Sequence, residues 1–259
     1  MKWLALALCA MALFAVAQNA SAEAKPTHCI GCDFSHADLH GRDLRGVDYI
    51  GVDFRQANLA RVDFTGAKLV GADFQGADLR GANFNGVDCS GCTFRNARLD
   101  GATFGNVKLA GADLRGALRG LSDEQIRELL NHCTGCNLRG ENLSGRNLSG
   151  ATLTAIDLRD ADVTSTRFEN ARLVGSDFRR ADLRQADLSG AVVCWHPWED
   201  GRPNTQTECV DLAGADVHGA RLTNLRICDT ERGVWTCSGT DAATLKRYSG
   251  NALEGAILR

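Results

Sequence analysis

Residues 72–81 read ADFQGADLRG, one five-residue unit written twice: a small residue, Asp, a large apolar residue, a variable residue and Gly. The large apolar residue returns at every fifth position from 34 to 114, with Cys89 as a substitute, and again from 138 to 193 and from 212 to 227. A period of five matches neither the 3.6 residues of a helical turn nor the two-residue alternation of a strand. The period predicts a chain that turns a corner every five residues.

The order of residue types within the unit indicates which side chains face the interior. We expect the large apolar residue and the small residue two positions before it to point inward, and the Asp or Asn between them to point outward. Gly at the corner tolerates the backbone conformation required there. Because one unit cannot bury its apolar pair alone, the units must stack on one another, as in other repeat proteins.

The tandem pattern A-[DN]-[LF]-x-G resembles that of the pentapeptide-repeat family. The resemblance implies an all-β fold: a right-handed four-sided β-helix with four units in each coil, here with short helical interruptions and two cysteine-bracketed loops. With twenty residues per coil, one side would carry a column of Phe residues and the opposite side a second column. The columns are Phe34, Phe54, Phe74 and Phe94, and Phe64, Phe84 and Phe104. Columns of like residues suit a close-packed core.

The repeat breaks near residue 119, and the segment after it has the pattern of a short helix. Ser122 and Gln125 form a capping box, and Leu121 and Ile126 form a hydrophobic staple. We expect a second short helix within 241–247, followed by Leu253 and Leu258 in the five-residue spacing. Whether the two repeat blocks form one continuous rod is left open.

The predicted divisions are a leader (1–22), a first repeat block (23–118), a helical interruption (119–132), a second repeat block (133–193) and a C-terminal part with loops, repeats and a cap (194–259).

Residues 1–22 have the pattern of a secretory signal peptide. Lys2 precedes an apolar run from Trp3 to Ala17, and Ala20-Ser21-Ala22 is a small-x-small cleavage site. The run is shorter than the roughly 20 residues that a membrane span needs. We therefore expect cleavage after Ala22 and a periplasmic or secreted protein with no membrane insertion afterwards.

Ten of the eleven cysteines follow the leader, an even number that suits an oxidising compartment. In three CxxC pairs the first Cys takes the large apolar position and the second takes the small position of the next unit, so both should face inward beside one corner. We favour a disulfide across each corner, since a four-residue turn brings its end Cα atoms within about 7 Å. Two free apolar thiols, or a metal or thiol-redox site, are the alternatives. The pairs are Cys29–Cys32, Cys89–Cys92 and Cys133–Cys136.

The remaining four cysteines bracket two loops that interrupt the repeat. Each loop begins one residue after a large apolar position, and one complete coil separates the two starts, so both loops should leave the same corner on adjacent coils. We predict the pairs Cys194–Cys209 and Cys228–Cys237. A cross-coil pair of Cys194 with Cys228 is the rival, because stacked strands lie about 5 Å apart.

These loops hold three of the four tryptophans, and the indoles could cluster if the loops share a corner. Because Trp is enriched in binding hot spots, we take the loops as a candidate recognition patch. The alternative is that the indoles cover apolar core near the end of the coil. The candidate binding residues are Trp195, His196, Trp198 and Trp235.

Composition and motifs disfavour catalysis and nucleic-acid binding. The chain has 29 Lys and Arg against 32 Asp and Glu, and no single sign of charge dominates. The sequence has no nucleophile elbow, phosphate loop or dinucleotide turn, and its six histidines lack metal-ligand spacing. We therefore expect no catalytic residues, no cofactor and no metal.

The resemblance also implies a specific alternative, because members of this family mimic DNA, bind DNA gyrase and protect it from quinolones. This chain departs from them in its leader, its many cysteines and the Arg mixed among its outward Asp residues. The expected function is instead an exported, non-enzymatic structural or binding module that presents a loop patch to a protein or glycan of the cell envelope. A CxxC metal or thiol-redox protein is the second alternative. The partner and the oligomeric state are left open.

Overall fold

The computed structural model describes residues 27–199, 202–203, 208–210, 212, 215–223, 225–231 and 234–239. The predicted leader, the helix expected within 241–247, and Leu253 and Leu258 lie outside these ranges. The chain divides into two compact units, Met1–Ser122 (unit 1) and Asp123–Arg259 (unit 2), which are described separately. Among the described residues no helix is long and apolar enough to cross a lipid bilayer.

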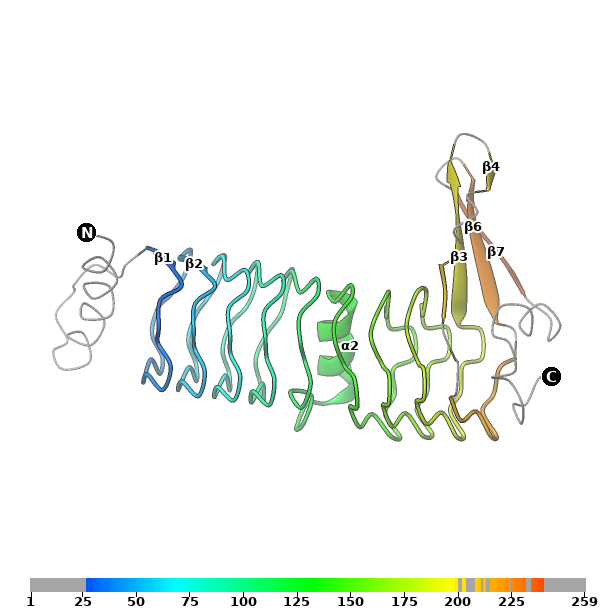
Figure 1. The fold of residues 1–259 in the computed structure, drawn as a ribbon, viewed down its shortest axis with the longest axis horizontal. Coiled ribbons are helices and arrows are strands. Elements are labelled where there is room, and N and C mark those ends of the chain that lie inside the picture. The colour runs from blue at the N-terminus through cyan, green and yellow to red at the C-terminus, as the bar shows by residue number, and fades with distance from the viewer. Residues whose placement is uncertain are drawn as a thin grey trace, which may run out of the picture. The chain divides into compact units, whose positions relative to one another are not determined.

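Each unit is a β-helix in which the backbone pairs with itself one coil further along (Figure 1). In unit 1, Asp53 forms a parallel bridge with Asp73, and Asp73 forms the next with Thr93. The Phe54 amide donates to the Asp73 carbonyl at 2.8 Å, and the Asp73 amide donates to the Val52 carbonyl at 2.9 Å. Most strands are single bridges; the first coils of unit 1 contain two longer ones, β1 (His28–Ile30) and β2 (Asp48–Ile50). The predicted all-β coil is confirmed.

A tight turn closes each corner. The Ala77 amide donates to the Phe74 carbonyl at 3.0 Å, and Gly76 between them has φ 68°. A positive φ at the third residue is the signature of a type II turn and explains the repeated Gly. Eleven described residues other than Gly also take a positive φ, among them Arg61 at 58° and Ala155 at 56°. The expectation of Gly at the corner therefore holds for many corners and fails at these.

The core consists of columns of side chains that run through successive coils. The Phe74 ring stacks on Phe54 at 5.2 Å and on Phe94 at 5.1 Å between ring centroids. It also meets Phe64 and Phe84 of the opposite column edge-on, at 6.0 and 5.8 Å. All five rings are fully buried. The two predicted Phe columns are confirmed.

Unit 2 begins with the helix α2 (Asp123–Asn131), which was expected from the capping box. Its buried residues are Ile126, Leu129 and Leu130, the face that the sequence indicated. Asp123 accepts a hydrogen bond from the Asn147 amide at 3.0 Å, and Asn131 accepts one from the Thr152 amide at 2.8 Å. The helix is therefore bonded at both ends to the coil of unit 2.

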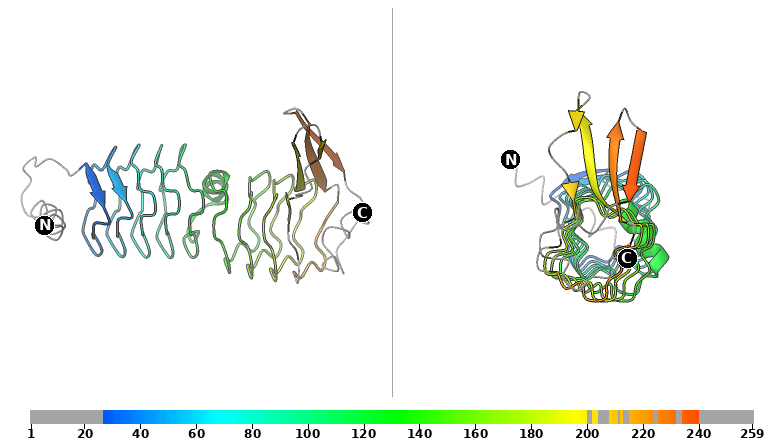
Figure 2. Two further views of the ribbon diagram at one scale, coloured as in Figure 1. Left: turned by 45° about the horizontal axis from the view of Figure 1, so that its top comes forward. Right: turned by 90° about the vertical axis from the view of Figure 1, so that its right-hand side faces the viewer.

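A second sheet leaves the coil of unit 2. Its strands follow the order β4-β3-β6-β7, and β5 pairs with β3. Figure 2 shows β3, β6 and β7 extending away from the coil on one side. We call these five strands the projection: β3 (Val192–Glu199), β4 (Arg202–Pro203), β5 (Glu208–Cys209), β6 (Arg226–Glu231) and β7 (Val234–Gly239).

Candidate functional site

The projection arises from two insertions at the same corner of adjacent coils. After the first insertion the coil resumes in register: Asp182 forms a parallel bridge with Asp216, and Asp187 forms one with Arg221. The coil therefore tolerates the inserted residues without losing its pairing. Strand β3 opens the first insertion, β6 opens the second, and the two strands are parallel neighbours. The prediction that both loops leave one corner is confirmed, and the loops are strands of one sheet.

The four cysteines of the projection occupy matched backbone positions. Cys194 is directly opposite Cys209 in the antiparallel pair of β3 and β5, and Cys228 is directly opposite Cys237 in the antiparallel pair of β6 and β7. Cys194 is in register with Ile227 and not with Cys228. Because adjacent residues of a strand belong to opposite faces, this register favours the pairs 194–209 and 228–237 over the cross-coil rival. The pairing itself stays a prediction.

The register divides the candidate binding residues between the two faces of the sheet. Trp195 is in register with Cys228, and Trp235 is in register with Thr230. Residues 228 and 230 share a face because strand faces alternate with a period of two. Trp195 and Trp235 therefore occupy one face of the sheet. His196 and Trp198 occupy the other, so the register gives two of the three Trp positions to one face and one to the other. The recognition patch itself stays a prediction.

In the CxxC pairs the structure places the two sulfur atoms of each pair at disulfide distance. The Cα atoms are 5.9 Å apart in Cys29–Cys32, 5.3 Å in Cys89–Cys92 and 5.5 Å in Cys133–Cys136, within the range a disulfide spans. All six cysteines are buried. Each pair therefore pins one corner of the coil from the inside, which leaves no exposed thiol in these pairs for redox exchange.

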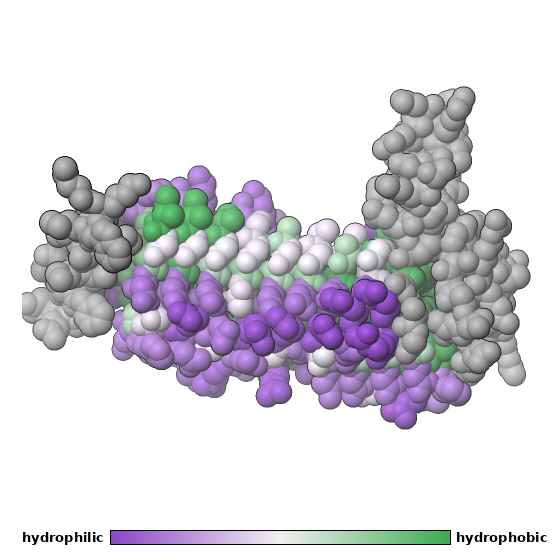
Figure 3. Space-filling model, viewed as in Figure 1, coloured by the Kyte–Doolittle hydropathy of each residue, from purple (hydrophilic) through white to green (hydrophobic). Residues whose placement is uncertain are grey.

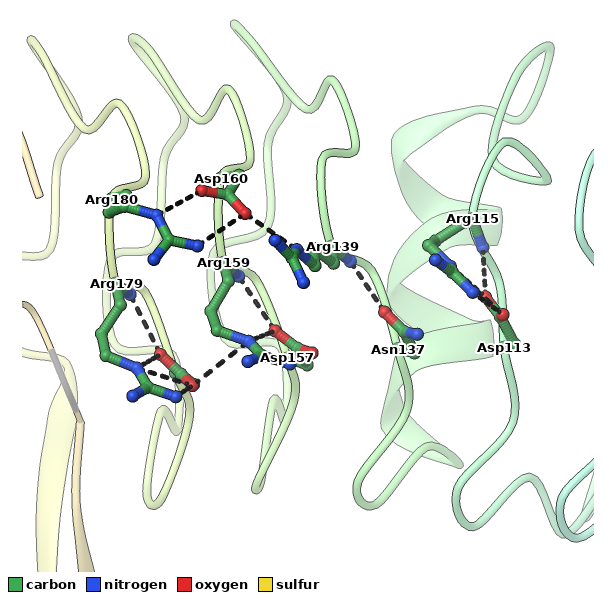
Figure 4. A network of polar contacts seen from close by, with 10 residues as sticks. Asp113, Arg115, Asn137, Arg139, Asp157, Arg159, Asp160, Arg179 and Arg180 are labelled. Carbon is green, nitrogen blue, oxygen red and sulfur yellow. Dashed lines mark hydrogen bonds and ion pairs between the residues drawn. The ribbon is translucent and has the colours of Figure 1, made fainter.

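The outward faces of unit 2 carry Asp and Arg side chains that bind one another (Figure 4). Arg159 donates to Asp157 at 2.6 Å and also lies 3.5 Å from Asp177 on the next coil. Asp160 accepts bonds from Arg180 at 2.6 Å and from Arg139 at 2.8 Å. The Arg180 bond, with Arg139 beside it, lowers the pKa of Asp160 to about 2. The pKa of Asp157 is likewise lowered, chiefly by its hydrogen bond from Arg159.

This network neutralises charge on the faces and forms no reactive centre. Each carboxylate of the repeated Asp-x-Arg motif also accepts the amide of the Arg, as in the 3.0 Å bond from the Arg179 amide to Asp177. In the part of the chain that the structure describes, no group of three or more His, Cys, Asp or Glu residues could hold a metal ion. His218 binds Asp216 at 2.7 Å through Nδ1 and is otherwise exposed. The network was not predicted, because it depends on which side chains meet across coils.

Comparison with known proteins agrees with this geometry. Two family models described as pentapeptide repeats match residues 50–86, 132–164 and 156–193, and residues 69–118. Together the matches cover about half of the chain. No curated protein matches the sequence.

Several solved structures are similar. HetL, a pentapeptide repeat protein involved in heterocyst differentiation regulation from the cyanobacterium Nostoc sp. strain PCC 7120, is 23% identical, with 80% of this chain and 90% of that chain covered and a TM-score of 0.37. QnrB1, a plasmid-mediated fluoroquinolone resistance protein, is 19% identical, with 90% and 89% covered and a TM-score of 0.37. A pentapeptide repeat protein from the Arabidopsis thaliana thylakoid lumen is 31% identical, with 42% and 77% covered and a TM-score of 0.25. From its family-model matches and its coil, the chain belongs to the pentapeptide repeat family.

Proposed function

We propose that this chain is an exported, non-enzymatic binding module whose coil holds the projection toward a protein partner in the cell envelope. The observation that carries the proposal is the pairing of β3 with β6 across two separate insertions. Two unpaired loops would have to be ordered when a partner binds, whereas a paired sheet is ordered beforehand and loses less entropy on binding. Corners pinned by buried cysteine pairs would further stiffen the support.

Export rests on the leader pattern together with the cysteine content. Three cysteine pairs at disulfide distance are typical of proteins that fold outside the cytosol. N-terminal sequencing of the protein recovered from its native cells tests this part. We expect the chain to begin at Glu23, and an intact leader on protein found in the cytoplasm would contradict export.

The gyrase-binding alternative is less well supported by the surface of the coil. A DNA mimic needs an uninterrupted acidic face, and here Arg159 and Arg179 bind the carboxylates of their own coil at 2.6 Å each. A supercoiling assay with the purified chain distinguishes the two functions. We expect no inhibition of gyrase and no protection from quinolones.

The binding role is tested by substitutions on the two faces of the projection. Crosslinking in intact cells, followed by identification of the captured protein, should yield a partner for the native chain. Trp195→Ala combined with Trp235→Ala removes both Trp positions of one face and should abolish capture, with little change in the melting temperature. Trp198→Ala on the opposite face is the matched control and should retain capture. A large fall in melting temperature in the double variant, with capture retained, would show that these residues cover the core instead.

A further inference from the structure

Unit 1 carries an exposed apolar stripe outside the projection. Among the described residues, the large hydrophobic side chains that are exposed are Ile30 (63%), Ile50 (38%) and Val70 (38%). Each follows an inward residue at the same corner, one coil apart: Ile30 pairs with Ile50 in the parallel register, and the Gly51 amide donates to the Val70 carbonyl at 2.9 Å. The space-filling view shows them as one green patch on unit 1 (Figure 3). We call these three residues the stripe.

At one corner position of the same type in unit 2, the apolar residue is buried. Val174 follows the inward residue Leu173 and is fully buried. Val174 lies one coil before Cys194, at the corner where β3 leaves the coil, whereas no insertion interrupts the corner of the stripe in unit 1. Three consecutive coils of unit 1 leave such a residue open to solvent, which makes this row a candidate contact surface.

A row of charged residues runs beside the stripe, two residues earlier in each coil. His28 begins the row, and the signs of the next four positions alternate from coil to coil: Asp48, Lys68, Asp88 and Lys108. His28 lies 3.7 Å and Lys68 lies 3.8 Å from the Asp48 carboxylate, and Lys108 lies 3.2 Å from that of Asp88. The Asp48 ion pairs are longer than hydrogen bonds, and its buried Oδ1 has no hydrogen-bond partner. We call this row the ladder.

We propose that the stripe and the ladder form a self-association surface on which a second copy of this chain docks side by side and antiparallel. A two-fold axis lying in the contact plane and perpendicular to the coil axis sets stripe against stripe and ladder against ladder, with the order of the coils reversed. With the axis between the coils of Asp48 and Lys68, each Asp48 faces Lys68 of the second copy. The His28 imidazole then faces Asp88 of the second copy, so no overlapping position meets a like charge.

Other arrangements of two copies lose this match. If the axis passes through a coil instead of between coils, each overlapping ladder position faces one of the same sign. Parallel copies with ladder against ladder bring Asp48 against Asp48, which repels. The axis between the coils of Asp48 and Lys68 sets Ile50 against Val70 in both directions and Ile30 against Ser90, and it overlaps four ladder positions of each copy. The axis one coil earlier overlaps only two ladder positions, and the axis one coil later sets no stripe residue against another. Charge therefore sets the half-coil offset, and ladder overlap and apolar contact together select the coil.

The surface is narrow compared with the roughly 800 Å² per partner of a standard interface, so the dimer should be weak and dependent on concentration. The ladder makes it sensitive to salt, because exposed ion pairs are screened. All of its residues belong to unit 1, so the inference is independent of the projection and of its partner.

Charge reversal tests the proposed register. Asp48→Lys leaves lysine at both central ladder positions, and Lys68→Asp leaves aspartate at both, so each variant should repel its own copy. Sedimentation of the purified full chain should show a dimer for the native sequence and at least about tenfold weaker self-association for each variant. When the two variants are mixed, the two central lysines of one copy face the two central aspartates of the other, so association should return as a heterodimer.

The controls separate docking from folding. Lys108→Asp alters the ladder beyond the overlap and should leave self-association unchanged, although it also removes an intramolecular ion pair. Circular dichroism melting of each variant establishes that it is folded. A native chain that is monomeric at every attainable concentration would overturn the proposal, as would a dimer that survives Asp48→Lys or a mixture that forms no heterodimer.

Discussion

The two units build the same coil from different side chains. In unit 1 the core centres on two Phe columns whose rings stack at 5.1–5.5 Å along each column. In unit 2 most of the same positions hold Leu, and Phe168 and Phe178 meet edge-on at 5.9 Å across the core. The corners differ as well, since unit 2 often uses residues such as Ala155 and Arg180 where unit 1 mostly uses Gly. Backbone pairing and the corner turn are therefore common to both units, while the filling of the core is interchangeable.

The small inward position shows why the filling is interchangeable. In unit 2 this position holds Thr166, whose buried hydroxyl donates to the Leu143 carbonyl at 2.7 Å, and Ser176, whose hydroxyl donates to the Leu153 carbonyl. In unit 1, Cys92 places its sulfur 3.0 Å from the Leu69 carbonyl, at the same sequence separation of 23. The small inward position faces a backbone carbonyl of the previous coil. A small side chain with a polar atom therefore fits there, as does the methyl group of Ala.

Removing one ring from the Phe columns should have the largest effect. Phe74→Ala deletes a fully buried ring that touches four others, and we expect a loss of about 3–5 kcal/mol of unfolding free energy. Phe178→Ala in unit 2 deletes an equally buried ring with one aromatic neighbour. Because each aromatic contact contributes about 0.5–1.5 kcal/mol beyond burial, the Phe74 variant should lose more.

Urea unfolding of the two variants, compared with the native chain, measures this difference. Leu153→Ala, which removes a buried Leu from unit 2, serves as a reference without aromatic contacts. Equal losses for Phe74→Ala and Phe178→Ala would mean that stacking along the columns adds nothing to ordinary burial.

Exchanging residues at the corners should have a smaller effect, of opposite sign in the two units. Gly86 has φ 70°, and an added Cβ would meet Gly66 atoms no closer than 3.8 Å, so Gly86→Ala meets no steric obstacle. Its cost is the left-handed backbone alone, about 1–2 kcal/mol. Ala155→Gly relieves the same conformation at φ 56° and should stabilise unit 2. The gain should be under about 1 kcal/mol, because Gly loses more freedom on folding.

Both corner variants are measured by the same urea titration, with Gly91→Ala as a second corner of unit 1 where an added Cβ meets nothing within 4 Å. A loss of stability in Ala155→Gly would show that the Ala methyl group makes contacts worth more than the strain. The comparison between units would then rest on packing at the corner and not on backbone conformation.

The sequence predicts those parts of the molecule that depend on periodicity. The five-residue spacing places Phe74 opposite Phe84, and the Ser122 capping box places the start of α2, because both follow from local rules. The five-residue spacing also predicts that the two loops leave one corner, but not that they continue as the paired strands β3 and β6, since the loop residues lie outside the repeat. The exposed stripe did have a signal, apolar residues at outward positions twenty residues apart. That signal is seen only when the sequence is written coil by coil.

The smallest expected effect concerns ion pairs between coils, which also differ between the units. In unit 1 the cross-coil distances range from 3.2 Å between Lys108 and Asp88 to 3.9 Å between Arg55 and Asp73, whereas in unit 2 Arg180 and Arg139 bind one carboxylate, Asp160, at 2.6 and 2.8 Å. Arg180→Gln removes the largest cause of the lowered pKa of Asp160, so that pKa should rise from about 2 toward its ordinary 3.8. NMR titration of the Asp160 carboxyl carbon measures the change.

The direction of the pH dependence follows from the lowered pKa. Because Asp160 binds its proton less readily when folded than when unfolded, its ion pairs stabilise unit 2 fully above pH 3.8, and this stabilisation is lost as the pH falls toward 2. The loss should be slight, since all three side chains are well exposed to solvent. Arg184→Gln, which removes the partner of Asp182 instead, should leave the Asp160 midpoint unchanged. If Arg180→Gln also leaves the titration midpoint of Asp160 unchanged, the bonds from Arg180 and Arg139 to Asp160 do not hold in solution. The two units would then not differ in their ion pairs between coils.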